Sequence, residues 1–62
     1  MNFKIEIRGR YTADVEAEGL PAASLIVEAA KARADVALIR VRFPGGRTRV
    51  VAFEGGRWVG SL

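Results

Sequence analysis

Residues 3–17 read FKIEIRGRYTADVEA, and apolar and polar side chains alternate along this stretch with a period of two. Such alternation is typical of a half-buried β-strand. One strand of this length would extend about 50 Å, whereas a compact chain of 62 residues has a radius of gyration of roughly 10–11 Å. We therefore predict two antiparallel strands joined by Arg8-Gly9-Arg10 as a three-residue loop. This register pairs Ile7 with Tyr11, Ile5 with Ala13 and Phe3 with Val15.

The residues after this hairpin change to a helical period. Gly19-Leu20-Pro21 ends the strand pattern, and proline suits the first turn of a helix, where its missing N–H is not needed. From Ala22 to about Arg33, apolar residues recur at the i, i+3, i+4, i+7 spacing of one helical face. Alanine favours the helix intrinsically, and its small size allows close packing on a sheet. The apolar positions are Ala22, Leu25, Ile26, Ala29 and Ala30.

Strand and turn patterns fill the last third of the chain. Alternation predicts strands over 37–43, 47–54 and 57–59. Pro44-Gly45-Gly46 forms one turn, and Gly55-Gly56 forms a two-residue turn that requires positive φ. We therefore predict one α+β domain, residues 1–62, in the order ββαβββ, with a mostly antiparallel five-stranded sheet and one helix on one face. The expected core is Phe3, Ile5, Ile7, Val15, Leu25, Ile26, Ile39, Val41 and Phe43.

The register of the hairpin over 37–54 decides which side chains lie on the open face of the sheet. With Gly45-Gly46 as a two-residue tip, Val41 lies opposite Val50, and both face the helix. With Pro44-Gly45-Gly46 as a three-residue loop, Phe53 and Val51 turn toward the helix and Arg49 turns inward. We favour the first register. Its open face holds Leu38, Arg40, Arg42, Arg49, Val51, Phe53 and Trp58.

The composition argues against catalysis. The chain has no cysteine, no histidine and only two serines, Ser24 and Ser61, so the commonest nucleophiles, general base and zinc ligands are missing or scarce. The glycine pairs are hairpin tips rather than a phosphate-binding loop that leads into a helix. We therefore expect no enzyme, no cofactor and no metal. We also expect a cytoplasmic protein without a membrane span, because no signal peptide pattern or apolar run of about 20 residues occurs.

Positive charge is concentrated in the second half of the chain. The net charge of +3 divides into −1 for residues 1–35 and +4 for residues 36–62. Aromatic rings offer contact area and arginine offers directional charge, a combination found in protein interfaces and on sheets that stack nucleic-acid bases. The alternative is that the two aromatic residues belong to the core and the arginines to a solvated face. The predicted partner-binding patch on the open face is Arg40, Arg42, Arg49, Arg57, Phe53 and Trp58.

Three features carry a family resemblance. They are the alanine-rich helix around Ala22-Ala23-Ser24-Leu25, an alternating strand with arginine before a glycine turn, and the closing Glu54-Gly55-Gly56-Arg57-Trp58-Val59. With these motifs, the C-terminal two-thirds resembles small phage-encoded anti-CRISPR proteins that inhibit type I (I-F-like) surveillance complexes. The resemblance implies an inhibitor that docks on the CRISPR–RNA effector complex in the host cytoplasm and blocks target DNA. It implies that Arg57 is a contact and Trp58 its packing support.

Two other functions stay open. The chain departs from the resemblance at Arg47 and Arg49, where apolar residues are expected, so a basic module that binds nucleic acid directly is the first alternative. A structural or antitoxin-like subunit is the second, because an edge strand or the open face can also pair with another protein. All three hypotheses describe binding without catalysis.

Overall fold

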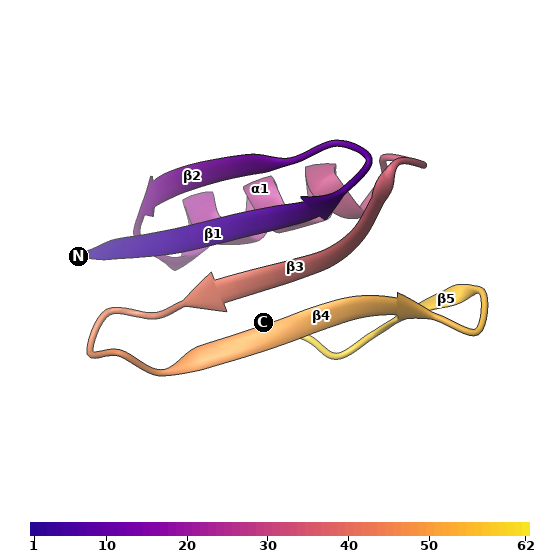
Figure 1. Ribbon diagram of the computed structural model, residues 1–62. Coiled ribbons are helices and arrows are strands. Elements are labelled where there is room, and N and C mark those ends of the chain that lie inside the picture. Colours follow the sequence, from indigo (N-terminus) through magenta and orange to yellow (C-terminus); the bar gives the residue numbers. More distant parts are fainter.

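The computed structural model describes all 62 residues as one five-stranded antiparallel sheet with a single helix, so the predicted ββαβββ order is confirmed (Figure 1). The spatial order of the strands is β2-β1-β3-β4-β5. The longest dimension is 32 Å and the radius of gyration is 10.8 Å, which is why the alternating stretch folds into a hairpin. The elements are β1 (Asn2–Gly9), β2 (Ala13–Glu18), α1 (Leu20–Lys31), β3 (Val36–Arg42), β4 (Thr48–Glu54) and β5 (Arg57–Val59).

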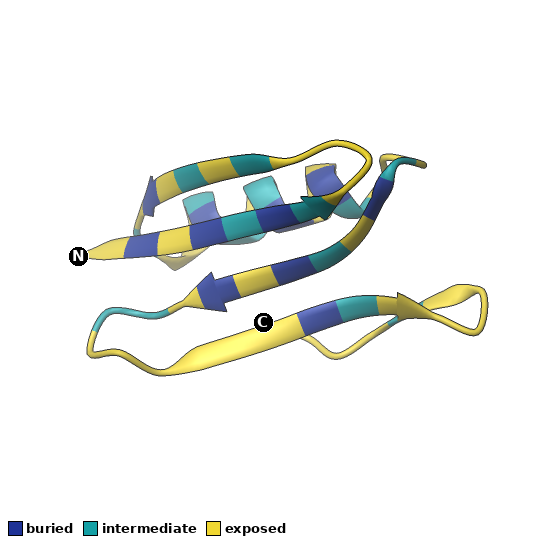
Figure 2. Ribbon diagram, in the orientation of Figure 1, coloured by how far each residue is buried: buried dark blue, intermediate teal, exposed yellow.

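The core is the layer between α1 and the sheet, and every buried residue is apolar. Figure 2 shows buried residues alternating along β1 and β3, whereas the start of β4 is exposed on both faces. The helix packs mainly on β1, β2 and β3, and β4 adds only Val51 to the core. The buried residues are Phe3, Ile5, Ile7, Ala17, Ala23, Val27, Ala30, Val36, Ile39, Val41 and Val51.

The predicted register of the first hairpin is wrong by two residues. In the structure Ile7 lies opposite Ala13, so Tyr11 belongs to the connection between β1 and β2. The cause is a hydrogen bond between this connection and the residue that precedes β3. Tyr11 N–H donates to the Asp35 carbonyl at 3.0 Å, which draws the connection away from the hairpin axis. Gly9 makes this approach possible, since a Cβ there would lie 2.4 Å from the same carbonyl oxygen.

The helix turns a different face to the sheet from the one predicted. Ala23, Val27 and Ala30 are buried, whereas Leu25, an expected core residue, is 73% exposed. The two small alanines allow α1 to lie close to the sheet, and the helix is apolar on most of its circumference, so its pattern does not distinguish one face from the next. Val15, Ile26 and Phe43 were also expected in the core and pack partly buried against it.

The single helix, α1, is not long and apolar enough to span a membrane.

The second hairpin has the three-residue loop rather than the favoured two-residue tip. Phe43 N–H donates to the Arg47 carbonyl at 2.7 Å and Gly46 N–H to the Phe43 carbonyl at 3.0 Å, which closes the loop around Pro44-Gly45-Gly46. Val41 therefore lies opposite Arg49. This shift of one residue exchanges the two faces of β4, because side chains alternate along a strand.

Candidate binding surface

The six residues predicted to form one patch are divided between the two faces of the sheet. Arg40 and Arg42 lie on the open face of β3, and Arg57 lies on the open face of β5 opposite Glu54. On β4, Arg49 and Phe53 share the helix-facing side with buried Val51, and Trp58 pairs with Phe53 on that side. The predicted single patch is therefore wrong, and its cause is the one-residue register shift. Whether these residues bind a partner stays a prediction.

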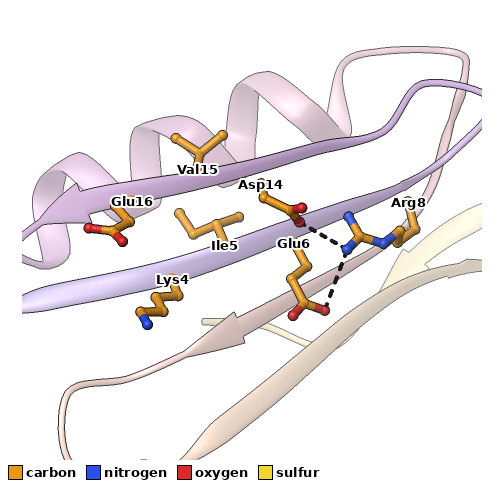
Figure 3. A pocket seen from close by; sticks show the side chains of 7 residues that line it. All are labelled: Lys4, Ile5, Glu6, Arg8, Asp14, Val15 and Glu16. Carbon is orange, nitrogen blue, oxygen red and sulfur yellow. Dashed lines mark ion pairs between the residues drawn. The ribbon is translucent and has the colours of Figure 1, made fainter.

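Arg40 is held by an ion-pair network on the open face. Its guanidinium lies 2.8 Å from a Glu6 carboxylate oxygen. Arg8 lies 3.9 Å from Glu6 and 2.9 Å from Asp14, as Figure 3 shows around a shallow hollow of about 240 Å³ over β1 and β2. The row Asp14–Arg8–Glu6–Arg40 thus joins three neighbouring strands. Because Glu6 already occupies it, Arg40 is a poorer candidate contact than the arginines without a partner.

Most unpaired basic side chains lie in the second half of the chain. Of the ten Lys and Arg residues, Arg8, Lys31, Arg33 and Arg40 are in ion pairs, which leaves six without one. Four of these six lie between residues 42 and 57, where Glu54 is the one acidic residue. The six are Lys4, Arg10, Arg42, Arg47, Arg49 and Arg57.

Three of the unpaired arginines surround the end of the β3–β4 hairpin, and we call Arg42, Arg47 and Arg49 the basic hairpin tip. Arg42 lies on the open face opposite Thr48, and Arg49 lies on the other face opposite Val41. All three side chains are exposed. The tip therefore presents cations on both sides of one hairpin, an arrangement suited to phosphate groups that approach from more than one direction.

Aromatic packing holds part of this tip in place. The Arg47 guanidinium lies 5.3 Å from the centre of the Phe43 ring, within the range of a cation–π interaction. Phe43 in turn packs edge-to-face on buried Phe3, with ring centres 5.0 Å apart. Arg47 was not among the predicted site residues. One sequence signal could have identified Arg47. The three-residue loop, the register that we did not favour, places Arg47 directly opposite Phe43.

Trp58 connects the end of the sheet to the helix. Its indole N–H donates to the Lys31 carbonyl at 3.1 Å, so the side chain satisfies one of the carbonyls left free in the last turn of α1. Its ring packs edge-to-face on Phe53 with centres 5.5 Å apart. Trp58 is half-buried, and Phe53 is 48% exposed. The contacts of Trp58 are therefore structural, and Phe53 is the more accessible ring of the pair.

Arg57 lies away from the basic hairpin tip. It is next to the Gly55-Gly56 turn, at the opposite end of β4 from Thr48. The seven residues of β4 cover about 23 Å at the rise of a β-strand. Both turn glycines have positive φ, 58° and 83°, as the predicted turn requires.

Arg33, like Arg40, is paired with an acidic neighbour, in a local cluster with Asp35 and Tyr11. It donates hydrogen bonds of 2.9 and 3.0 Å to the Asp35 carboxylate, and its guanidinium lies 3.6 Å from the centre of the Tyr11 ring. The hydrogen bonds from Arg33 hold the pKa of the Asp35 carboxyl below its usual value. This cluster fixes the connection between α1 and β3.

The side chains offer no assembled metal site, since no three His, Cys, Asp or Glu residues are grouped closely enough to hold an ion. What the arrangement offers is exposed arginine at one hairpin end. Searches of protein-family models, of curated proteins and of solved structures give no match to this chain.

Proposed function

We propose that this chain is a non-catalytic binding protein whose basic hairpin tip contacts phosphate groups of a nucleic-acid-containing partner. The observation that carries the proposal is the presence of three exposed arginines without ion pairs, Arg42, Arg47 and Arg49, around one three-residue loop. Arginine presents a planar fork of N–H donors that matches the oxygens of a phosphate. Elsewhere most acidic side chains are already paired within the chain.

The partner we propose is a type I CRISPR–RNA effector complex in the cytoplasm of a host cell. The support is the resemblance of the alanine-rich helix and the closing Gly-Arg-Trp-Val hairpin to anti-CRISPR inhibitors. On this proposal the tip contacts phosphate groups of the guide RNA in the effector, and the chain blocks target DNA. Arg57, at the other end of β4, supplies a second contact.

Direct binding of nucleic acid is the second candidate function, because the same exposed arginines favour it. The two differ in the salt dependence and the partner preference of binding. A protein that neutralises phosphates on a free duplex loses affinity steeply with salt, with a slope of about −0.9 per phosphate in a plot of log K against log salt. Three arginine contacts give a slope of about −2.7.

The test is a titration of fluorescent duplex DNA at two salt concentrations, beside a titration of a purified type I-F effector charged with its guide RNA. Selective binding to the effector, with target DNA excluded, supports the inhibitor. Binding to any duplex with the slope above supports the nucleic-acid module. Failure to bind either one at low salt refutes both.

A matched pair of single variants tests the residues. Changing Arg49 to Glu should weaken binding strongly and leave the fold intact, because exposed charges contribute little to stability. Changing Arg10 to Glu alters the net charge equally, at an unpaired basic residue in the connection between β1 and β2, and should weaken binding far less. Equal losses in the two variants would show that net charge matters and the hairpin tip does not.

A further inference from the structure

The edge of the sheet opposite β5 is open. Strand β2 pairs with β1 on one side and has no strand on the other. Its six residues present an edge about 20 Å long. Gly19 N–H donates to the Met1 carbonyl. Because hydrogen-bonded and non-hydrogen-bonded residue pairs alternate along an antiparallel ladder, the odd-numbered residues of β2 form the hydrogen bonds to β1. The backbone N–H and C=O groups of Asp14, Glu16 and Glu18 therefore point away from the sheet.

An apolar groove of about 300 Å³ lies on the helix side of the sheet, at the end of β2 that follows the connection from β1. Its lining includes Val15 of β2 together with Ile26 and Ala29 of α1. Leu25, one helical turn before Ala29, is 73% exposed. A strand added to β2 would point alternate side chains toward this groove, because Val15 shares its face of the sheet with buried Ile5.

The other face of the same edge is acidic. Asp14, Glu16 and Glu18 pair across the ladder with Glu6, Lys4 and Asn2 on the open face. Glu16 has no ion pair, and Glu18 has one weak contact, 3.7 Å from the Met1 amino group with both groups 82% exposed. Two of the three carboxylates are thus available to cations opposite them on an added strand.

We propose that β2 is a docking edge for an extended segment of a partner protein in which basic and apolar side chains alternate. The free N–H and C=O groups supply the strand pairing, the carboxylates select basic residues on one face, and the groove receives apolar residues on the other. A second copy of this chain is disfavoured, because antiparallel pairing of two β2 strands would bring carboxylates opposite one another on the same face.

The probe is a blocked synthetic peptide of about eight residues in which lysine alternates with valine. The expected result, followed by NMR of the isotope-labelled protein, is chemical-shift change centred on β2 and slowed hydrogen exchange of the Asp14, Glu16 and Glu18 amides. A peptide in which glutamate replaces lysine should bind at least ~10-fold more weakly. Equal binding of the two peptides, or the absence of shifts in β2, would overturn the proposal.

Variants separate the backbone from the charges. Glu16→Pro removes one outward N–H and is compatible with an edge strand, and it should lower affinity at least ~10-fold. Glu16→Gln should lower it by about 3-fold. The control is Thr48→Pro, which removes an equivalent N–H on the opposite edge at a position that β5 does not pair, and it should leave affinity unchanged.

Self-association is the competing outcome. Sedimentation analysis that finds a dimer abolished by Glu16→Pro would assign the edge to a second copy and refute a separate partner. Strand β1 separates β2 from the β3–β4 hairpin that carries the basic hairpin tip, so the two proposals can be tested separately. Loss of peptide binding by Glu16→Pro with nucleic-acid or effector binding unchanged shows that this proposal does not depend on the proposed function.

Discussion

Replacement of Ile39 by alanine should be among the most damaging substitutions in this chain. Ile39 has no exposed surface and lies between Ile7 on β1 and Val51 on β4, which are both buried. The substitution removes three methyl or methylene carbons at a site enclosed on both sides by neighbouring strands. Such a site cannot collapse without moving the sheet.

The expected cost is about 3–4 kcal/mol, within the range for large-to-small changes at fully buried positions. A domain of this length has a total stability of roughly 3–9 kcal/mol, so the variant should lose a third or more of it. The melting temperature should fall by about 12–30 °C. Ile39→Val, at about 0.5–1.5 kcal/mol, provides a measurable step if the alanine variant does not fold.

Leu25→Ala is the matched control, since it removes a similar number of carbons from a side chain that is 73% exposed. It should change stability by less than about 0.5 kcal/mol. Urea denaturation followed by circular dichroism measures both variants. If Leu25→Ala destabilises the protein as much as Ile39→Ala, then α1 turns the face containing Leu25 to the sheet, and the core described above is incorrect.

Three further outcomes are expected. Trp58→Phe keeps a ring but removes the donor to the Lys31 carbonyl, so it should cost about 1 kcal/mol in urea denaturation; no loss would mean that the bond does not stabilise the helix end. The Asp35 carboxyl should titrate by NMR below the usual aspartate pKa and return toward it in Arg33→Ala. Because the folded pKa is lowered, this contribution to stability is present above the ordinary value near ~3.9 and is lost as the pH falls through the folded value. Gly9→Ala would place a Cβ 2.4 Å from a backbone oxygen and should cost about 2–3 kcal/mol in thermal melts, whereas an unchanged melting temperature would show that the close approach relaxes freely.

The order of elements could be predicted because the residue pattern repeats with the period of each element. Period two along β1, β2 and β3 and the helical spacing after Pro21 each match a local geometry. The helix face could not be predicted in the same way. Leu25 and Val27 are both apolar, and the choice between them depends on how closely small residues such as Ala23 allow the helix to approach the sheet.

The prediction of the candidate site was wrong because the register of the β3–β4 hairpin differs by one residue from the favoured one. Along β4 the sequence Val50-Val51-Ala52-Phe53 is apolar at consecutive positions, so either face could be buried. The observed register was disfavoured because it turns Arg49 toward the helix side. In the structure Arg49 is on that side and still exposed, since α1 packs mainly on β1, β2 and β3. A local pattern does not tell how much of a sheet one helix covers.

The strand order also has a consequence for the rate of folding. Three of the four strand pairings join consecutive strands, β1 with β2, β3 with β4 and β4 with β5, whereas β1 and β3 pair across a long separation in the chain. In that pairing Ile5 meets Val41, 36 positions away. The entropy of closing this one long loop has to be overcome before its contacts form. The rate-limiting event should therefore be the docking of a preformed ββα half against a preformed βββ half, along the seam between β1 and β3.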